Sequence, residues 1–165
     1  MKTPALKLTV ASLLLAAGTC FAAGALSVSR EVTVDNSPAT VWKLVGNFDS
    51  LDVWHPAVTS SSLNGSGTKV GTRRLLTLSD GATIVESLVS YSAAKMSYSY
   101  TIIKGPFPVA NYRSTLTLTP TAEGHALMTW TSTFDAKGVP DEKATEIIGG
   151  VYDSGMAKVV ANFKK

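Results

Sequence analysis

One histidine lies in a setting that could support acid–base chemistry, the run Trp54-His55-Pro56. An imidazole acts as a general acid or base when a carboxylate orients it, and Asp52 is the nearest carboxylate in the sequence. A zinc site needs further ligands, and the other histidine, His125, follows a distant turn. We therefore predict no metal site and expect His55 to be a polar group at a cavity rim that Trp54 and Pro56 seal, with catalysis as the alternative.

One carboxylate falls on the apolar face of a predicted strand, where it must be paired or protonated. This residue, Glu86, alternates with Ile84 and Leu88. Its expected partner is Arg74 on the preceding strand, with the neighbouring Arg73 as the alternative. Such a pair could orient a polar group of a ligand or provide a general base. It could also be purely structural, or lie at a sheet edge where both side chains reach water, and we favour one of these two non-functional roles.

Aromatic side chains gather on one face of three predicted strands. The bulkier face of each strand should point inward, and these faces carry Met96, Tyr98, Tyr100 and Ile102, then Tyr112, Ser114, Leu116 and Leu118, then Met128, Trp130 and Phe134. Buried tyrosine hydroxyls and indole nitrogens need partners, which can be water, a ligand or other side chains. We therefore predict a cavity, with a fully packed core as the alternative.

Two further segments contribute to the predicted site. Phe107 lies between two prolines in "GPFPVANY" and is expected to be a hydrophobic lid or part of a rigid connection. Tyr152 and Met156 lie on the apolar face of the last predicted helix. The full set of predicted ligand-contacting residues is Trp54, His55, Arg74, Glu86, Tyr98, Tyr100, Phe107, Tyr112, Met128, Trp130, Tyr152 and Met156.

The elements that position these residues follow from the apolar patterning. Alternation and turn chemistry predict seven strands joined mostly by hairpins, at 26–35, 57–63, 70–78, 82–90, 95–103, 109–119 and 125–135. Two short helices should follow the first strand. The first is capped by Asn36 or Ser37 with Pro38 in its first turn. The second, near 49–53, should end at His55, because a residue before proline avoids the helical region.

The last segment, 140–163, has apolar residues at three- and four-residue steps, which predicts one long amphipathic helix. Gly149, Gly150 and Gly155 each weaken a helix interior by about 1 kcal/mol, so we expect them to permit close approach to the sheet. The predicted fold class is therefore α+β, with a long terminal helix across a curved seven-stranded antiparallel sheet.

The N-terminus predicts export. Lys2 and Lys7 precede a short uncharged apolar run, and small residues follow, with cleavage expected after Ala22 or Ala25. The run is too short to span about 30 Å of hydrocarbon, so stable membrane insertion is not expected. Residues 1–25 are thus interpreted as a signal peptide that is removed.

What remains is one domain, residues 26–165, expected in the periplasm or outside the cell. It lacks Cys20, the only cysteine, so neither disulfides nor thiol chemistry are expected. Loss of the two signal-peptide lysines reduces 15 basic side chains to 13, against 12 acidic ones, and lowers the net charge from +3 to +1. No basic run interleaves with aromatic residues, so nucleic acid is not an expected partner. Known cofactor and nucleophile motifs are lacking, and no cofactor is predicted.

Four segments carry a family resemblance: "NFDSLDVWHPAV", "GTRRLLTLSDGATIVESLVSY", "KMSYSYTI" and "FPVANYRSTLTLTP". They resemble the START-like superfamily, also called SRPBCC or Bet v 1-like, which includes polyketide cyclase-like proteins and plant abscisic acid receptors. Within it the chain is most similar to the MxaD-like exported accessory proteins of bacterial methanol oxidation. The resemblance implies a helix-grip fold with a hydrophobic cavity between the sheet and the last helix. It also implies a periplasmic dehydrogenase or its cytochrome as a partner.

Three functions are compatible with these features. The preferred one is an exported domain that binds a small hydrophobic ligand, or assists a periplasmic oxidation system, without catalysing a reaction. The first alternative is a cyclase- or dehydratase-like enzyme that uses Glu86, Arg74 and His55. The second is an interaction protein whose cavity is closed.

Overall fold

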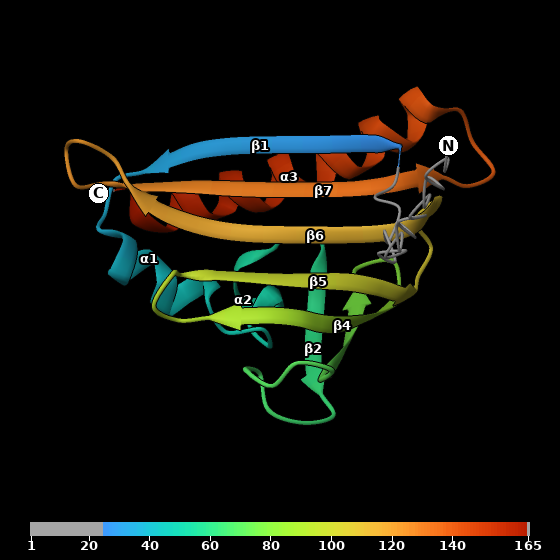
Figure 1. Cartoon of the computed structure of the whole chain (residues 1–165), viewed down its shortest axis with the longest axis horizontal. Helices are drawn as coiled ribbons and strands as arrows, with labels where there is room; N and C mark the ends of the chain where they lie inside the picture. The colour runs from blue at the N-terminus through green and yellow to red at the C-terminus, as the bar shows by residue number, and fades with distance from the viewer. Residues whose placement is uncertain (1–24, 165) are drawn as a thin grey trace, which may run out of the picture.

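Seven strands with alternating apolar and polar residues form one curved antiparallel sheet (Figure 1). The computed structural model describes residues 25–164, so all but the last residue of the expected signal peptide, with Cys20, lies outside the described residues. The strands are β1 (Leu26–Val34), β2 (Val58–Leu63), β3 (Arg73–Leu78), β4 (Thr83–Ser92), β5 (Ser97–Lys104), β6 (Val109–Pro120) and β7 (Ala126–Ala136). Their order is β1-β7-β6-β5-β4-β3-β2, a meander to which the first strand is added beside the last. The predicted fold class is confirmed.

Strand boundaries differ from the sequence-based ranges mainly at turns. β3 begins at Arg73 rather than at residue 70, because Gly71 has a φ of 87° and the amide of Thr72 bonds to the carbonyl of Lys69 in a turn. A positive φ is accessible to glycine at little cost, so this turn delays the strand. A bulge interrupts the β6–β7 register between Ala110 and Arg113, where Asn111 has a φ of 52°. Bulges of this kind re-aim the side chain that follows.

Two short helices follow β1, as predicted. Helix α1 (Pro38–Val45) begins after Ser37, whose side chain accepts a hydrogen bond from the amide of Thr40, and it buries Val41 and Val45. Helix α2 (Leu51–Trp54) ends where His55 adopts extended backbone with a ψ of 117° before Pro56. The chain then enters β2 directly, which brings this short helix close to the inner face of the sheet.

Helix α3 (Asp141–Phe163) lies across one face of the sheet, behind β1 and β7 in Figure 1. Its glycines have two different roles. A Cβ added to Gly155 would lie 2.7 Å from His55 Cδ2, and one added to Gly149 would lie 2.5 Å from Arg30 Nη2. The expectation for Gly150 is wrong, because this residue is exposed and nothing lies within 4 Å of its added Cβ. Within residues 25–164, no helix is both long and apolar enough to cross a membrane.

The inner face of the sheet is the face predicted from side-chain alternation. Its buried residues on β5, β6 and β7 are Tyr98, Tyr100, Tyr112, Ser114, Leu116, Leu118, Ala126, Met128, Trp130, Ser132 and Phe134. On β3 and β4 the same face carries Arg74, Leu76, Ile84, Glu86 and Leu88, all buried. The aromatic and charged residues of this face therefore meet the inner side of α3 and the short helices.

Candidate functional site

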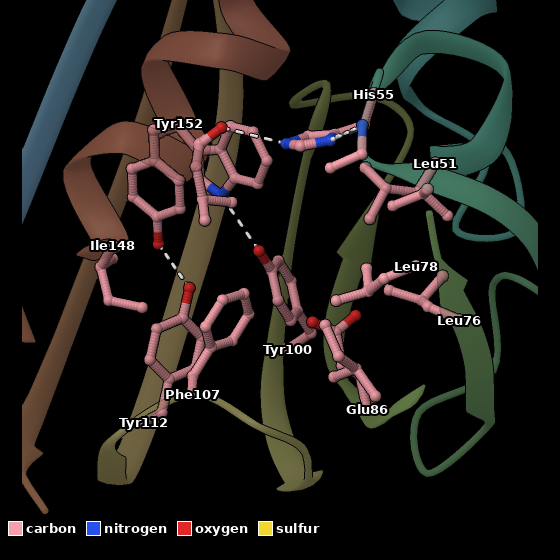
Figure 2. Close-up of a pocket in the computed structure, with 15 residues that line it drawn as sticks. Leu51, His55, Leu76, Leu78, Glu86, Tyr100, Phe107, Tyr112, Ile148 and Tyr152 are labelled. Carbon is pink, nitrogen blue, oxygen red and sulfur yellow. Dashed lines mark hydrogen bonds between the residues drawn. The ribbon is translucent and has the colours of Figure 1, made fainter. Parts of the chain in front are cut away.

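A cavity of about 140 Å³ lies between the inner face of the sheet, α2 and α3 (Figure 2). Its apolar lining consists of Leu51, Ala57, Val58, Leu76, Leu78, Ile84, Phe107, Ile148 and Val151. Its polar or partly polar lining consists of His55, Glu86, Tyr100, Tyr112, Trp130 and Tyr152. The cavity is therefore mostly apolar, with a few convergent polar groups, which is the usual composition of a small-molecule site.

A directional chain of hydrogen bonds crosses one wall of the cavity. The Ser114 hydroxyl donates to the carbonyl of Thr131 at 2.8 Å, so its oxygen can only accept from Tyr152, whose hydroxyl lies 3.0 Å away. The Tyr152 hydrogen is thereby used, and the Tyr112 hydroxyl donates to Tyr152 at 2.5 Å. All three hydroxyl hydrogens of this chain are satisfied within the protein.

The Trp130 indole joins the same wall. Its Nε1 lies 3.0 Å from Ser114 Oγ and 3.1 Å from the Tyr100 hydroxyl oxygen, and it donates to both. Its ring stacks on Tyr152 with centroids 4.3 Å apart and planes 13° from parallel. Because an indole has no acceptor, Tyr100 is left with a hydroxyl hydrogen for which the described residues offer no acceptor.

The tyrosines of this interior remain protonated at neutral pH. Burial is the main cause that raises the pKa of Tyr98, to about 12, and it raises the pKa values of Tyr100, Tyr112 and Tyr152 as well. A buried phenolate would lack the solvation that water provides. These side chains therefore serve as hydrogen-bond donors and acceptors rather than as bases.

Glu86 forms a buried ion pair with Arg74, its direct cross-strand neighbour. Arg74 Nε donates to Glu86 Oε2 at 2.5 Å, and Nη1 donates to the carbonyl of Phe48 at 2.7 Å. The guanidinium also lies over the Phe48 ring at 4.1 Å, and Nη2 has no hydrogen-bond partner among the described residues. Of the two alternatives for the partner of Glu86, the structure selects Arg74, while Arg73 points outward and is exposed.

The charge state of this pair reflects opposing effects. Burial raises the pKa of Glu86, and Arg74 acts against that shift. Burial also disfavours the Arg74 cation and is the largest single effect, but the Glu86 carboxylate together with Tyr98 and Tyr100 outweighs it, and the net pKa of Arg74 is raised. Each charge therefore depends on the other, which is typical of an ion pair removed from water.

His55 is buried, and both of its ring nitrogens are engaged by the backbone. Nε2 donates to the carbonyl oxygen of Val151 at 3.0 Å, and Nδ1 accepts from the amide of Ala57 at 3.2 Å. This pattern defines the neutral Nε2–H tautomer. Burial lowers the pKa of His55, and the positive charge of Arg74 acts in the same direction. The ring thus fastens the segment after α2 to the middle of α3.

The expected rim around His55 differs from the structure. Trp54 is only 1 % exposed and packs edge-on against Trp130, with ring centroids 5.5 Å apart, so it lies behind the cavity wall rather than at a rim. Pro56 is exposed and does not line the cavity. The difference arises because Trp54 lies three residues after Leu51, so both side chains share the buried face of α2. Phe107 does line the cavity, from the connection between β5 and β6 (Figure 2).

Seven of the twelve predicted contact residues line the cavity: His55, Glu86, Tyr100, Phe107, Tyr112, Trp130 and Tyr152. The other five, Trp54, Arg74, Tyr98, Met128 and Met156, are buried behind the wall. Sequence reasoning missed the aliphatic part of the lining. Leu76, Leu78 and Ile84 share an inward strand face with the predicted charged pair, so alternation could have identified them. Leu51 and Val58 reach the cavity only through the packing of α2, which no local pattern reports.

The described lining of this cavity offers hydrogen bonding, apolar contact and the buried Arg74–Glu86 pair. Among the described residues, no group of three or more His, Cys, Asp and Glu side chains is arranged to hold a metal ion. A curved antiparallel sheet wrapped around a long helix, with an apolar cavity between them, is the architecture of a START-like, ligand-binding SRPBCC domain, and the match to a family model supports this class.

Residues 25–164 match the family model described as "Polyketide cyclase / dehydrase and lipid transport", and the chain belongs to that family. The solved structure of XoxI from Bacillus cereus is 34 % identical, with a TM-score of 0.78 over 83 % of this chain and 94 % of that one. A protein from Thermobifida fusca is 30 % identical, with a TM-score of 0.75 over 83 % of this chain and 92 % of that one. A START superfamily protein from Mycobacterium smegmatis shares the fold at 15 % identity, with a TM-score of 0.70 over 83 % and 96 % of the two chains. No curated protein sequence matches this chain.

Proposed function

We propose that this protein is an exported domain that binds a small, mostly apolar molecule and does not itself catalyse a reaction. The observation that carries the proposal is the cavity of about 140 Å³ lined mainly by aliphatic and aromatic side chains. An apolar cavity of about 150 Å³ in another protein accommodates benzene, whereas sites for drug-sized ligands measure about 300–1,000 Å³. The ligand is therefore about the size of one aromatic ring.

The polar groups of the cavity support binding rather than catalysis. A general base needs a free lone pair near the reacting proton. His55 uses both nitrogens in backbone hydrogen bonds, and the Tyr112 and Tyr152 hydroxyls are donors in a chain that ends on a carbonyl. Among the described lining residues, the carboxylate with a free acceptor atom is Glu86, and its charge is already paired with Arg74.

Export and a protein partner are further parts of the proposal. The basic, then apolar, then small-residue pattern of residues 1–25 supports secretion to the periplasm or beyond. The resemblance to MxaD-like accessory proteins supports a role beside a periplasmic oxidation system of the methanol type, with a dehydrogenase or cytochrome as partner. In that role the bound molecule would be delivered or sequestered, not converted.

The test is native mass spectrometry of the protein purified from its own compartment, followed by solvent extraction of what it carries. We expect a mature chain without the signal peptide and one small molecule per chain. Leu78→Trp should fill the cavity and remove the bound mass, whereas Leu75→Trp, on the opposite face of the same strand and 44 % exposed, should retain it. An empty wild-type chain would contradict the proposal.

A second function has one observation in its favour. Glu86 is buried in the cavity wall with a raised pKa, and such carboxylates are frequent general bases. A cyclase- or dehydratase-like enzyme would use it with Arg74 and His55. Glu86→Gln distinguishes the two functions, provided that the variant folds: an enzyme would lose turnover while it retained binding, and a binding domain would show only a changed affinity.

A further inference from the structure

We infer that the cavity selects an uncharged ligand that carries one hydroxyl group, held between Tyr100 and Glu86. This inference rests on the proposed function, since it specifies the chemistry of the molecule that the cavity binds. It follows from a count of the hydrogen-bonding atoms in the lining and from the balance of buried charge.

The only unmatched hydroxyl donor in the described part of the cavity wall belongs to Tyr100. The hydrogens of Tyr112, Tyr152 and Ser114 are consumed in the chain that ends on the Thr131 carbonyl. Tyr100 accepts from the Trp130 indole but finds no acceptor for its own hydrogen among the described residues. Because Tyr100 is 2 % exposed, bulk water does not readily solvate that hydrogen. A buried donor without a partner costs free energy, so a ligand acceptor placed here is favoured.

The matching acceptor is the second carboxylate oxygen of Glu86. Oε2 receives Arg74 Nε, and no described residue donates to Oε1. Glu86 pairs with Ile102 across the β4–β5 ladder, and Tyr100 lies two residues away on the same face of β5. Diagonal neighbours of this kind lie roughly 7–8 Å apart, so the two side chains share one stretch of the cavity wall. Figure 2 shows the Glu86 carboxylate and the Tyr100 ring side by side on the wall beneath Leu78.

The charge balance of the lining excludes an ionised ligand. Apart from the tyrosines, the ionisable lining residues are Glu86 and His55; the carboxylate is paired with Arg74, and the imidazole is neutral. A carboxylate or ammonium ligand would bring an unpaired charge into an apolar space at high cost. A hydroxyl group suits the site because it accepts from Tyr100 and donates to Glu86 at once. With the volume of one ring, the ligand class is a phenol or a small alcohol.

The test compares the affinities of four probes for the purified protein after delipidation, by titration calorimetry. The probes are phenol, toluene, benzoate and benzylamine, which share one ring and differ in the polar group. We expect phenol to bind about tenfold more tightly than toluene, since one buried hydrogen bond is worth about that factor. We expect benzoate and benzylammonium to bind more weakly than toluene.

A variant series assigns the preference to the two residues. Tyr100→Phe leaves Ser114 as acceptor for the Trp130 indole, so the wall keeps its structure, and the phenol-to-toluene preference should fall about tenfold. Tyr91→Phe, which removes a hydroxyl outside the cavity, is the matched control and should leave the preference unchanged. Anisole, which lacks the donor hydrogen, tests Glu86 in the wild-type protein without any substitution and should bind more weakly than phenol.

The outcomes separate this inference from the proposed function. Equal binding of phenol and toluene, or preferred binding of benzoate or benzylamine, would overturn the hydroxyl assignment and leave the cavity as a binding site. An unchanged preference in Tyr100→Phe would do the same. If none of the probes binds, both the hydroxyl assignment and the proposed function fail together.

Discussion

His55 Nε2 donates a hydrogen bond to the carbonyl oxygen of Val151 at 3.0 Å, and this contact joins two elements that are far apart in the sequence. The imidazole is held on its other side by the amide of Ala57. Gly155 makes the contact possible, because its missing side chain leaves room for the ring against α3. The residue with the most obvious catalytic potential in the sequence is thus a clamp on one wall of the cavity.

The clamp predicts a pH-dependent stability. Burial lowers the pKa of His55 below its usual 6.5, so its stabilising contribution is fully present above pH 6.5 and is lost as the pH falls through the folded-state pKa. His55→Gln keeps a donor for Val151 but does not titrate. We expect the urea midpoint of the wild type to decrease between pH 7.5 and pH 5 by more than that of the variant. Glu86 titrates in both proteins, so its contribution cancels in the comparison.

His125→Gln is the control for this experiment, since the His125 side chain is 43 % exposed and its Nδ1 lies 3.5 Å from the Asp35 carboxylate on the surface. It should retain the wild-type pH dependence. Identical profiles for wild type and His55→Gln would show that the clamp does not exist in solution.

A pair of glycine substitutions on α3 tests the close approach of this helix. In Gly155→Ala the new methyl would lie 2.7 Å from His55 Cδ2 and 3.1 Å from Trp130 Cζ3, both in packed rings. The helix gains about 1 kcal/mol in propensity, but overpacking costs about 1–3 kcal/mol, so we expect a net loss of stability. Gly150→Ala meets nothing within 4 Å and should stabilise by about 0.5–1 kcal/mol. Thermal unfolding of both variants measures the difference, and equal shifts would contradict the packing.

The Arg74–Glu86 pair predicts a non-additive response to substitution. Removal of either partner leaves a buried charge without compensation, so Arg74→Met or Glu86→Leu alone should cost about 3–5 kcal/mol. The double variant removes both charges and should be considerably more stable than the sum of the single losses implies. Denaturant unfolding of the four proteins gives the coupling energy directly. Additive losses would mean that the two side chains do not interact.

Much of the fold and part of the site followed from local pattern. Alternation identified the inward faces of the strands, because a strand with one buried face must repeat its apolar residues with a period of two. The same rule placed Glu86 and Arg74 on one face, and the structure places them directly opposite each other. The observed strand ends differ from the predicted ones at turns. Before β3, for example, Gly71 has a positive φ, which interrupts the extended backbone.

The remainder depends on contacts that no local period encodes. The hydrogen bond between His55 and Val151 forms only if α3 packs against the sheet in one particular position. The inward position of Trp54 requires α2 to pack onto the same face of the sheet. Gly150 looked like its neighbouring glycines in the sequence, but it lies on the outer side of the helix. Glycines have no side chain that marks the buried or the exposed side of a helix. The packed structure is therefore needed to tell a glycine that contacts a neighbouring element from one that is exposed.

The central claim is that a small neutral molecule occupies the space between the sheet and α3. The most direct measurement is a crystal structure of the protein grown with phenol. We predict a phenol ring against Leu76 and Ile148, with its oxygen between the Tyr100 hydroxyl and Glu86. A cavity filled by rearranged side chains, or phenol bound only at the surface, would contradict the claim.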